Sequence, residues 1–303
     1  MSDERMAHYA AEWQAWMEAE YTGRLGTFFE DIINAIYSVI LKPGDLAVDC
    51  GANCGLHTFP MSELVGPSGR VVAVEAIPDL AAGLAQRGFP NVDVKATAIG
   101  AAAGRASFFV VRDGIGYSGL QQRRDLPSDL AGSVDVIEVP VATLDSLLGD
   151  RRQRVRFVKM DLEGGEFHAL QGATSILRDR PLVIFEHDRE SAALYGYTSN
   201  DWFSLFDTAN FAVFDLFGRP FFRSDWHAGG MPWYFIAAAR ARRMRDSSSG
   251  ARLVWFADCI GKKLCGGGSG RARESARQSM RFAVNSARSM VTTPYILRLL
   301  LQA

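Results

Sequence analysis

Short apolar runs alternate with helix-like segments through the middle of the chain, and this alternation is the main indication of its fold. Five runs are apolar along most of their length, which is typical of strands buried on both faces of a parallel sheet. They are residues 46–49, 70–75, 92–96, 155–161 and 182–187. Helical segments lie between several of them, at residues 56–64, 80–87 and 166–178. The pattern predicts an α/β fold with a doubly wound, mostly parallel sheet.

Further patterned segments flank this core. Residues 1–42 carry apolar and aromatic side chains at helical spacing, which predicts N-terminal helices. Two additional strand pairs are predicted, the first around a hairpin or extended insertion from Gly114 to Gly132, and the second as an antiparallel pair that closes the sheet. Their strands are residues 106–112 with 134–141, and 211–217 with 233–238.

The composition changes after Ala239. Segments 247–250 and 266–270 are typical of linkers, and the stretch from Arg240 to Ala303 holds thirteen arginines and lysines against three acidic residues. The whole chain has a net charge of −1, so the rest of it is acidic. We predict three parts: an N-terminal helical cap (1–42), a cofactor-binding domain (43–240), and a basic, helical or partly disordered extension (241–303).

The extension and the remaining composition bear on location and partners. Apolar residues among the arginines of the extension predict weak contact with an anionic membrane surface. The extension has no basic stripe interleaved with aromatic residues, so no nucleic-acid partner is expected. The four cysteines lack the spacing of a zinc site, and the N-terminus lacks the pattern of a secretory signal. The expected location is the cytoplasm, with peripheral membrane contact through the extension, and the oligomeric state is left open.

A glycine-rich turn after the first strand indicates a nucleotide-type cofactor. Gly51 and Gly55 permit a tight turn and a close approach to a ligand, and Glu75, at the end of the second strand, is placed to accept both hydroxyls of a ribose. The turn lacks the third glycine of the dinucleotide fingerprint and the Lys-Ser/Thr of a P-loop. An adenosine cofactor without a phosphate chain fits this pattern, and S-adenosylmethionine is such a cofactor.

Acidic residues and a histidine follow two later strands. Ligands bind beyond the carboxyl ends of the strands in an open parallel sheet, so we expect Asp161 to face the cofactor, with Glu163 close by. Glu166 is more simply explained as a helix N-terminal charge. Glu186 and His187 end the next strand, and histidine is the usual base for a hydroxyl acceptor, although a structural histidine is equally compatible. The candidate catalytic residues are Asp161, Glu186 and His187.

These three residues also offer hard ligands for a divalent cation. Strand-end carboxylates often serve hydrogen bonding alone, so we expect no metal in the site.

Four blocks of the sequence resemble the FkbM-type methyltransferases, a family of the class I S-adenosylmethionine-dependent superfamily. The resemblance covers roughly residues 28–240, and the basic extension lies outside the family pattern. The blocks are residues 43–45 with 49–55, 65–71 with 74–78, 143–145, and 158–166 with 170–173.

The resemblance implies a seven-stranded Rossmann-like sheet, S-adenosylmethionine as methyl donor, and O-methylation of a hydroxyl on a small molecule or a glycan sugar. It places Glu75 on the ribose, the turn near the methionine part, and Asp161 near the methyl group. It also places Ala98 and Ile99 beside the adenine. The residues expected at the cofactor are Asp49, Gly51, Ala52, Asn53, Gly55, Glu75, Ala76, Ile77, Ala98, Ile99, Asp161 and, from a segment ahead of the first strand, Glu30.

Two other classes of function remain open at this point. A nicotinamide-dependent oxidoreductase could use the same fold, although the missing third glycine counts against it. A non-catalytic cofactor-binding module could dock to a membrane through the basic extension. The sequence does not name the methyl acceptor, because loops line that pocket.

Overall fold

The computed structural model describes residues 25–149, 154–187, 189–216, 218, 220–227 and 233–240. The chain divides into two compact units, which we call the central unit (Leu41–Ala209) and the flanking unit (Met1–Ile40 with Asn210–Ala303). The first part of the predicted cap and the whole basic extension lie outside the described residues. The predicted domain boundaries and the role of the extension therefore stay predictions.

Seven strands form the main sheet, in the order β3-β2-β1-β7-β8-β10-β9. The first five belong to the central unit and are parallel to their neighbours. In the flanking unit β10 pairs with β9 in antiparallel fashion. The predicted α/β, mostly parallel, seven-stranded sheet is thus confirmed. The strands are β1 (Leu46–Cys50), β2 (Arg70–Glu75), β3 (Val92–Ala96), β7 (Val155–Met160), β8 (Leu182–Glu186), β9 (Phe211–Asp215) and β10 (Tyr234–Ala239).

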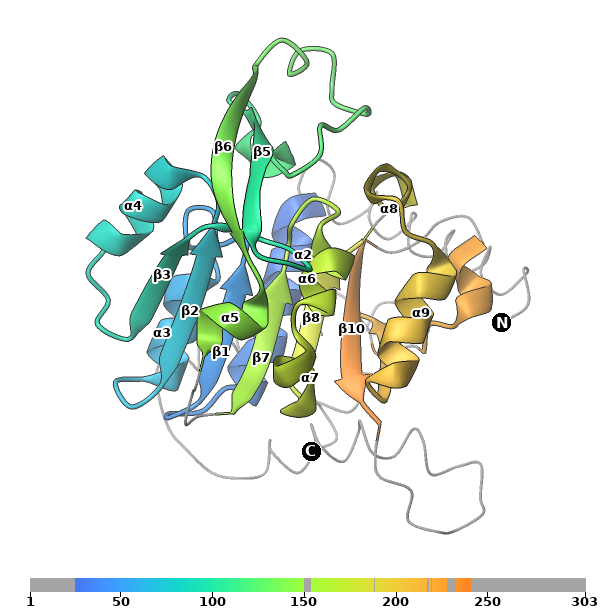
Figure 1. Ribbon diagram of the computed structural model, residues 1–303. Coiled ribbons are helices and arrows are strands. Elements are labelled where there is room, and N and C mark those ends of the chain that lie inside the picture. The colour runs from blue at the N-terminus through green and yellow to red at the C-terminus, as the bar shows by residue number, and fades with distance from the viewer. Residues whose placement is uncertain are drawn as a thin grey trace, which may run out of the picture. The chain divides into compact units, whose positions relative to one another are not determined.

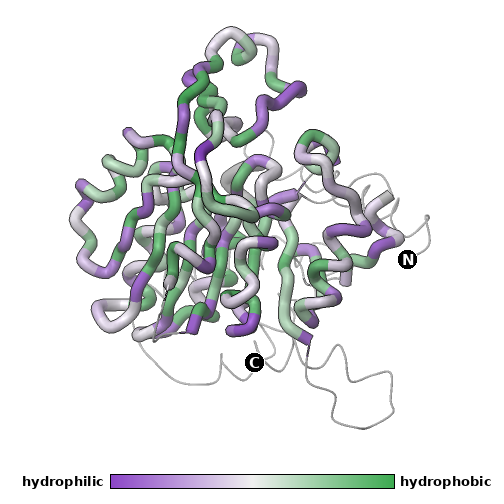
Figure 2. The backbone as a smooth tube through the Cα atoms, viewed as in Figure 1, coloured by the Kyte–Doolittle hydropathy of each residue, from purple (hydrophilic) through white to green (hydrophobic). Residues whose placement is uncertain are grey.

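Burial explains why the central strands are apolar without alternation. Every residue of β1 is buried, and so are the residues of β2 after Arg70. Helices α5 (Leu144–Leu148) and α7 (Thr174–Arg178) lie in front of the sheet in Figure 1, whereas α3 (Thr58–Val65) lies behind it. Both faces of these strands are therefore covered, and Figure 2 shows them as largely hydrophobic.

The strand order reverses between β1 and β7. The chain moves from β1 outward to β2 and β3, and it then returns to the other side of β1 as β7. The carboxyl ends of β1 and β7 meet there, since Cys50 pairs with Met160. This is the point at which open α/β sheets bind their ligands.

Two helical predictions differ from the structure. The single helix expected at 166–178 is two helices, α6 (Glu166–Gln171) and α7, because the chain turns at Gly172 against the backbone of Gly100; a Cβ there would lie 2.5 Å from the Gly100 carbonyl oxygen. The Asp145 carboxylate then accepts hydrogen bonds from the first N–H groups of α7. The segment from Arg189 onward, for which the sequence pattern above gives no helix, contains α8 (Arg189–Tyr195) and α9 (Ser199–Thr208).

A second, small sheet carries the predicted insertion. β5 (Gly104–Val111) and β6 (Val134–Ala142) form the expected antiparallel pair, and the short β4 (Ala98–Ile99) lies beside β6. We call residues 112–133, which include the short helix η1 (Ile115–Tyr117), the insertion loop. In Figure 1 the β5–β6 ribbon and this loop rise above the carboxyl ends of β1 and β2.

The remaining elements are α4 (Pro78–Gln86) in the central unit and α2 (Leu25–Ile40) and η2 (Arg223–His227) in the flanking unit. Within the described ranges, no helix combines the length and the apolar character that crossing a lipid bilayer requires.

Candidate active site

The glycine-rich turn after β1 runs directly against the end of β7. A Cβ on Gly51 would lie 1.9 Å from the backbone oxygen of Asp161, so only glycine fits at this position. Gly51, Asn53 and Gly55 all have positive φ angles, of 75°, 47° and 88°. The turn is held by hydrogen bonds from the Gly51 and Ala52 N–H groups to the Val74 carbonyl. The predicted cofactor turn and the predicted catalytic strand end are therefore in contact.

Glu75 lies where a ribose-binding carboxylate is expected. Its two oxygens accept hydrogen bonds from the backbone N–H groups of Asn53 and Ile77, each at 2.8 Å. Burial raises the pKa of Glu75, while these N–H donors oppose the shift. A carboxylate has about four acceptor sites, so acceptor capacity beyond these two bonds is left for a ribose hydroxyl.

An apolar surface lies next to Glu75. Ala76, Ile77 and Ala98 belong to one buried cluster with Phe108, Val110 and Val139. Ile99 follows on β4 and is also buried. A planar adenine needs an apolar surface of this kind beside the ribose acid.

Three further residues are predicted at the cofactor: Asp49 and Ala52, which lie at the glycine turn, and Glu30, which belongs to another part of the chain. Asp49 is buried at the end of β1; its Oδ2 accepts a hydrogen bond from the Thr58 hydroxyl at 2.6 Å, and its Oδ1 has no hydrogen-bond partner among the described residues. Ala52 packs under the turn against Ala73. Glu30 lies on α2 in the flanking unit, so its cofactor contact stays a prediction.

The ends of β7 and β8 bring three carboxylates together. One oxygen of each of Asp161, Glu163 and Glu186 lies within 4.8 Å of the others. Lys159 Nζ is 3.1 Å from Asp161 Oδ2. Burial, and then the charge of Asp161, raises the pKa of Glu186 well above its ordinary value. The same two causes raise the pKa of Glu163 to about 8. This carboxylate cluster therefore retains protons that isolated carboxylates lose.

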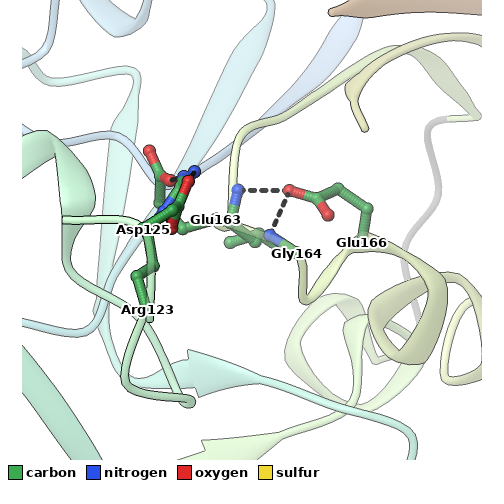
Figure 3. A network of polar contacts seen from close by, with 6 residues as sticks. Arg123, Asp125, Glu163, Gly164 and Glu166 are labelled. Carbon is green, nitrogen blue, oxygen red and sulfur yellow. Dashed lines mark hydrogen bonds and ion pairs between the residues drawn. The ribbon is translucent and has the colours of Figure 1, made fainter. Parts of the chain in front are cut away.

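Glu166 fixes the turn that carries Asp161 and Glu163. It begins α6 and is fully buried, and its Oε1 accepts hydrogen bonds from the N–H groups of Leu162 (2.7 Å) and Gly164 (3.4 Å). Figure 3 shows these two bonds. Burial raises the pKa of Glu166 to about 7. The position at the helix start agrees with the sequence expectation, but the side chain also shapes the site.

His187 and Glu186 face opposite sides of the sheet, as consecutive residues at a strand end do. Glu186 joins the carboxylate cluster, whereas His187 is 2% exposed, with its Nδ1 3.3 Å from the Tyr197 hydroxyl and its ring edge-on to Trp202. The geometry favours Glu186 over His187 for contact with an acceptor. The role of His187 as a base stays a prediction.

Arg123 is a site residue that sequence reasoning did not identify. It lies in the insertion loop, and its guanidinium pairs with both Asp125 and Glu163 (Figure 3). The loop has no periodic pattern, so nothing in the sequence indicates which of its charged residues turns inward. Arg123 and Glu163 are also far apart in the sequence, so no local pattern indicates that they pair.

The carboxylate cluster has a geometry that a divalent cation could use. Two cations of the chain itself already pair with it, because Lys159 contacts Asp161 and Arg123 contacts Glu163. The expectation that the site holds no metal stays a prediction.

The residues at the glycine turn fit S-adenosylmethionine. Glu75 offers acceptor sites for the ribose, the cluster with Ala76, Ile77 and Ala98 offers an apolar wall for the adenine, and the buried Oδ1 of Asp49 lacks a partner. The turn makes no provision for a pyrophosphate. This fold and this site define an S-adenosylmethionine-dependent methyltransferase.

The comparison with protein families gives the particular family. The methyltransferase FkbM domain matches residues 49–210, more than half of the chain, and the chain belongs to this family. S-adenosylmethionine is accordingly the methyl donor, and the oxidoreductase alternative is set aside.

Curated relatives match only short segments. Protein-L-isoaspartate O-methyltransferase 2 of Archaeoglobus fulgidus is 41% identical over 58 residues, which are 18% of this chain and 26% of that protein. Protein-L-isoaspartate O-methyltransferase of Methanothrix thermoacetophila is 50% identical over 40 residues, which are 13% of this chain and 19% of that protein. The chain thus spans about a quarter or less of the length of these two relatives.

Solved structures resemble the chain at low identity. The methyltransferase FkbM from Methylobacillus flagellatus KT is 14% identical with a TM-score of 0.39, over 78% of this chain and 60% of that one. The fibrillarin of Aeropyrum pernix, solved with natively bound S-adenosyl-L-methionine, is 15% identical with a TM-score of 0.39, over 69% of this chain and 74% of that one.

Proposed function

We propose that the chain transfers a methyl group from S-adenosylmethionine to a hydroxyl oxygen of a small molecule or sugar. The observation that carries the proposal is the carboxylate cluster at the ends of β7 and β8, which touches the cofactor turn through Asp161 and Gly51. Hydroxyl groups donate hydrogen bonds, and carboxylates are strong acceptors for them. The cluster therefore suits an acceptor that presents several hydroxyls.

Methyl transfer requires the protein to align the donor with the acceptor and to remove one proton from the acceptor hydroxyl. The bound donor supplies a methyl group on its sulfonium sulfur. As the acceptor oxygen bonds to the methyl carbon and the carbon–sulfur bond breaks, the acceptor O–H proton passes to a carboxylate of the cluster. Alignment of two bound reactants contributes about 7–11 kcal/mol to lowering such a barrier.

Asp161 is the best placed of the carboxylates to take this proton. Its backbone oxygen lies against the turn, and Lys159 Nζ, 3.1 Å away, favours its ionised form. Burial and the charge of Asp161 raise the pKa of Glu186 well above its ordinary value, so Glu186 suits the role of a hydrogen-bond donor better than that of the base. An ionised Asp161 beside a protonated Glu186 can accept a proton and still leave a second hydrogen-bonding group for the acceptor.

A carboxylate acceptor is the second candidate, favoured by the names of the curated relatives. An ionised carboxylate is already a nucleophile and needs no base, so it would make no use of the proton-accepting carboxylate that the proposal assigns to the cluster.

The chemical nature of the product tests the proposal. Methyl-tritiated S-adenosylmethionine would be incubated with the full chain and a panel of free monosaccharides, polyols and carboxylic acids. We expect label in methyl ethers, which survive alkali, and a loss of roughly 100-fold in rate for Asp161→Asn, in the range of general-base effects. Label released by alkali as methanol would show ester formation and would contradict the proposal, as would an undiminished rate in Asp161→Asn.

A further inference from the structure

The insertion loop carries one arginine that the proposed chemistry does not use. Arg123 lies in residues 120–126, which contain no helix or strand, and its side chain is 14% exposed. Arginine is rarely covered to this extent unless it is paired. Its neighbour Arg124 is exposed.

The guanidinium of Arg123 is engaged on two sides. Nε and Nη2 bind the two oxygens of Asp125 at 3.0 and 2.6 Å, which is a bidentate contact within the loop. Nη1 binds Oε2 of Glu163, on the turn after β7 (Figure 3). The planar fork therefore joins the insertion loop to the residue that lies two positions after Asp161.

Glu163 is where this link meets the carboxylate cluster. Its oxygen lies within 4.8 Å of oxygens of Asp161 and Glu186. Its backbone has a φ of 52°, and Gly164 follows with a φ of 102°. A shift of the Glu163 side chain changes its spacing from Asp161 and Glu186, so whatever fixes Glu163 also helps to fix the cluster.

A second contact supports the same connection. The ring of Tyr195, from α8, packs on the turn: a Cβ at Gly164 would lie 2.7 Å from it. The Tyr195 hydroxyl lies 3.3 Å from where a Cβ of Gly119 would be, in the insertion loop. The loop and the turn thus meet at two places, one polar and one aromatic.

The donor half of the site has separate supports. Gly51 and Ala52 bond to Val74, and Glu75 bonds to the N–H groups of Asn53 and Ile77. None of these bonds involves Arg123 or Glu163. A change at Arg123 should therefore reach the acceptor side and spare the donor side.

We propose that Arg123 is a positioning residue for methyl transfer, which acts through Glu163 to hold the insertion loop and the carboxylates Asp161 and Glu186 in place for the acceptor; this role rests on the proposed function. Arg123 is not a catalytic residue, since it contacts the cluster only through Glu163. The charged groups that face Glu163 are Arg123 on the insertion loop, Asp161 and Glu166 on the turn and α6, and Glu186 on β8.

The test compares Arg123→Gln and Arg123→Lys with the matched control Arg124→Gln in the full chain, and it needs no acceptor. Hydrogen exchange of peptides covering residues 112–133 and 161–166 measures the link. Calorimetry with S-adenosylhomocysteine measures the donor side. A titration of the ¹³C-labelled glutamate carboxyls by NMR follows the proton on Glu163, with Glu163→Gln assigning the resonance.

For Arg123→Gln we expect about tenfold faster exchange in both segments and a Glu163 midpoint raised by about one pH unit, since a neighbouring cation favours the ionised form. We expect the S-adenosylhomocysteine affinity to stay within about twofold of wild type. Arg123→Lys should restore the Glu163 midpoint, because it keeps the charge, but only part of the protection, because it lacks the fork. Arg124→Gln should match wild type.

Two results would overturn the role of Arg123. One is unchanged exchange in residues 161–166 of Arg123→Gln. The other is a loss of S-adenosylhomocysteine affinity as large as the change in exchange, which would mark a general structural role. Both results are independent of the product assay above, so a failure of hydroxyl methylation and a failure of this inference can be told apart.

Discussion

Glu75 and Glu163 are both largely covered acids at the carboxyl ends of strands of the central unit, β2 and β7, yet they are held in opposite ways. Glu75 is bound by two backbone N–H groups, which are neutral and fixed by the turn itself. Glu163 faces two further carboxylates and is balanced by an arginine from a distant loop. The donor side is therefore built from local backbone geometry, and the acceptor side from long-range charge pairing.

This difference has a consequence for evolution and for engineering. A site made of backbone contacts accepts one ligand shape and tolerates few changes. A site made of side-chain charges on a loop can be altered residue by residue while the sheet stays intact. The arrangement suits an enzyme family with one donor and varied acceptors.

The largest effect is expected from Gly51→Ala, which tests whether the donor side depends on backbone geometry. The new Cβ would meet the Asp161 carbonyl at 1.9 Å, and the φ of 75° adds strain. We expect a loss of roughly 3 kcal/mol or more in the free energy of unfolding, measured by denaturant titration.

Gly83→Ala is the matched control for that substitution. Gly83 lies inside α4 with nothing within 4 Å of an added Cβ, so the change should stabilise the chain by about 0.5–1 kcal/mol. If Gly51→Ala were as stable as wild type, the close approach of the turn to β7 would be wrong.

The next effect compares the two acids directly. Glu75→Gln places an amide NH₂ against a backbone N–H, so it loses one of the two acceptor positions. We expect the affinity for S-adenosylhomocysteine, measured by calorimetry, to fall by about 1.5–3 kcal/mol, roughly 10- to 150-fold. Glu163→Gln should leave this affinity within about twofold, because Glu163 lies on the acceptor side.

The surface acid Glu63, on α3, provides the control for both substitutions. Glu63→Gln should not change the affinity. Equal losses in Glu75→Gln and Glu163→Gln would remove the distinction between a donor side and an acceptor side.

The sequence predicts the donor side better than the acceptor side, and the reason lies in these contacts. The turn after β1 and Glu75 at the end of β2 are fixed by strand–turn–helix geometry, which leaves a local pattern of glycines and acids. The ends of β7 and β8 are likewise visible as the ends of apolar runs, so Asp161 and Glu186 could be found. Arg123 could not, since its partner Glu163 is forty residues away in a differently folded segment.

Two other differences follow from side-chain direction and from tertiary packing. Successive side chains of a strand point to opposite faces, so Glu186 and His187 are expected on different sides of the sheet. The sequence does not indicate which of the two sides holds the ligand. The helical pattern of residues 166–178 does not reveal the break at Gly172, because the break arises where the backbone passes Gly100. Helix α9 carries the buried Trp202 and Phe206, which pack against Phe185 of β8, and this contact is not visible in the sequence.

A smaller effect is expected from a change of pH. The pH dependence of stability reports the protonation of the carboxyl groups on the acceptor side. Burial raises the pKa of Glu163 to about 8 and that of Glu166 to about 7, both above the ordinary glutamate value near 4.5. Between the ordinary and the raised values the folded state binds more protons than the unfolded state. The free energy of unfolding should therefore fall as the pH rises from 5 to 9, by on the order of 1–3 kcal/mol.

Glu166→Gln should reduce this pH dependence in thermal unfolding, because the amide carries no titrating proton, while the contribution of Glu163 remains. Glu190→Gln, at an exposed position of α8, should leave the slope as in wild type. A wild-type stability that rose steadily over this range would mean that these carboxyls are ionised at little cost in the folded chain.

The smallest effect is expected from divalent cations, which compete for the same carboxylates as Lys159 and Arg123. To bind Asp161, Glu163 and Glu186 together, a cation must displace both side chains and remove the protons held by Glu163 and Glu186. We expect millimolar Mn²⁺ or Mg²⁺ to shift the midpoint of thermal unfolding at pH 7 by less than about 1 °C, since a ligand stabilises only in proportion to its occupancy. Arg123→Gln removes one competitor, so it should respond more than wild type. A shift of several degrees in the wild-type chain would instead make the acceptor side a metal site, with the donor side unchanged.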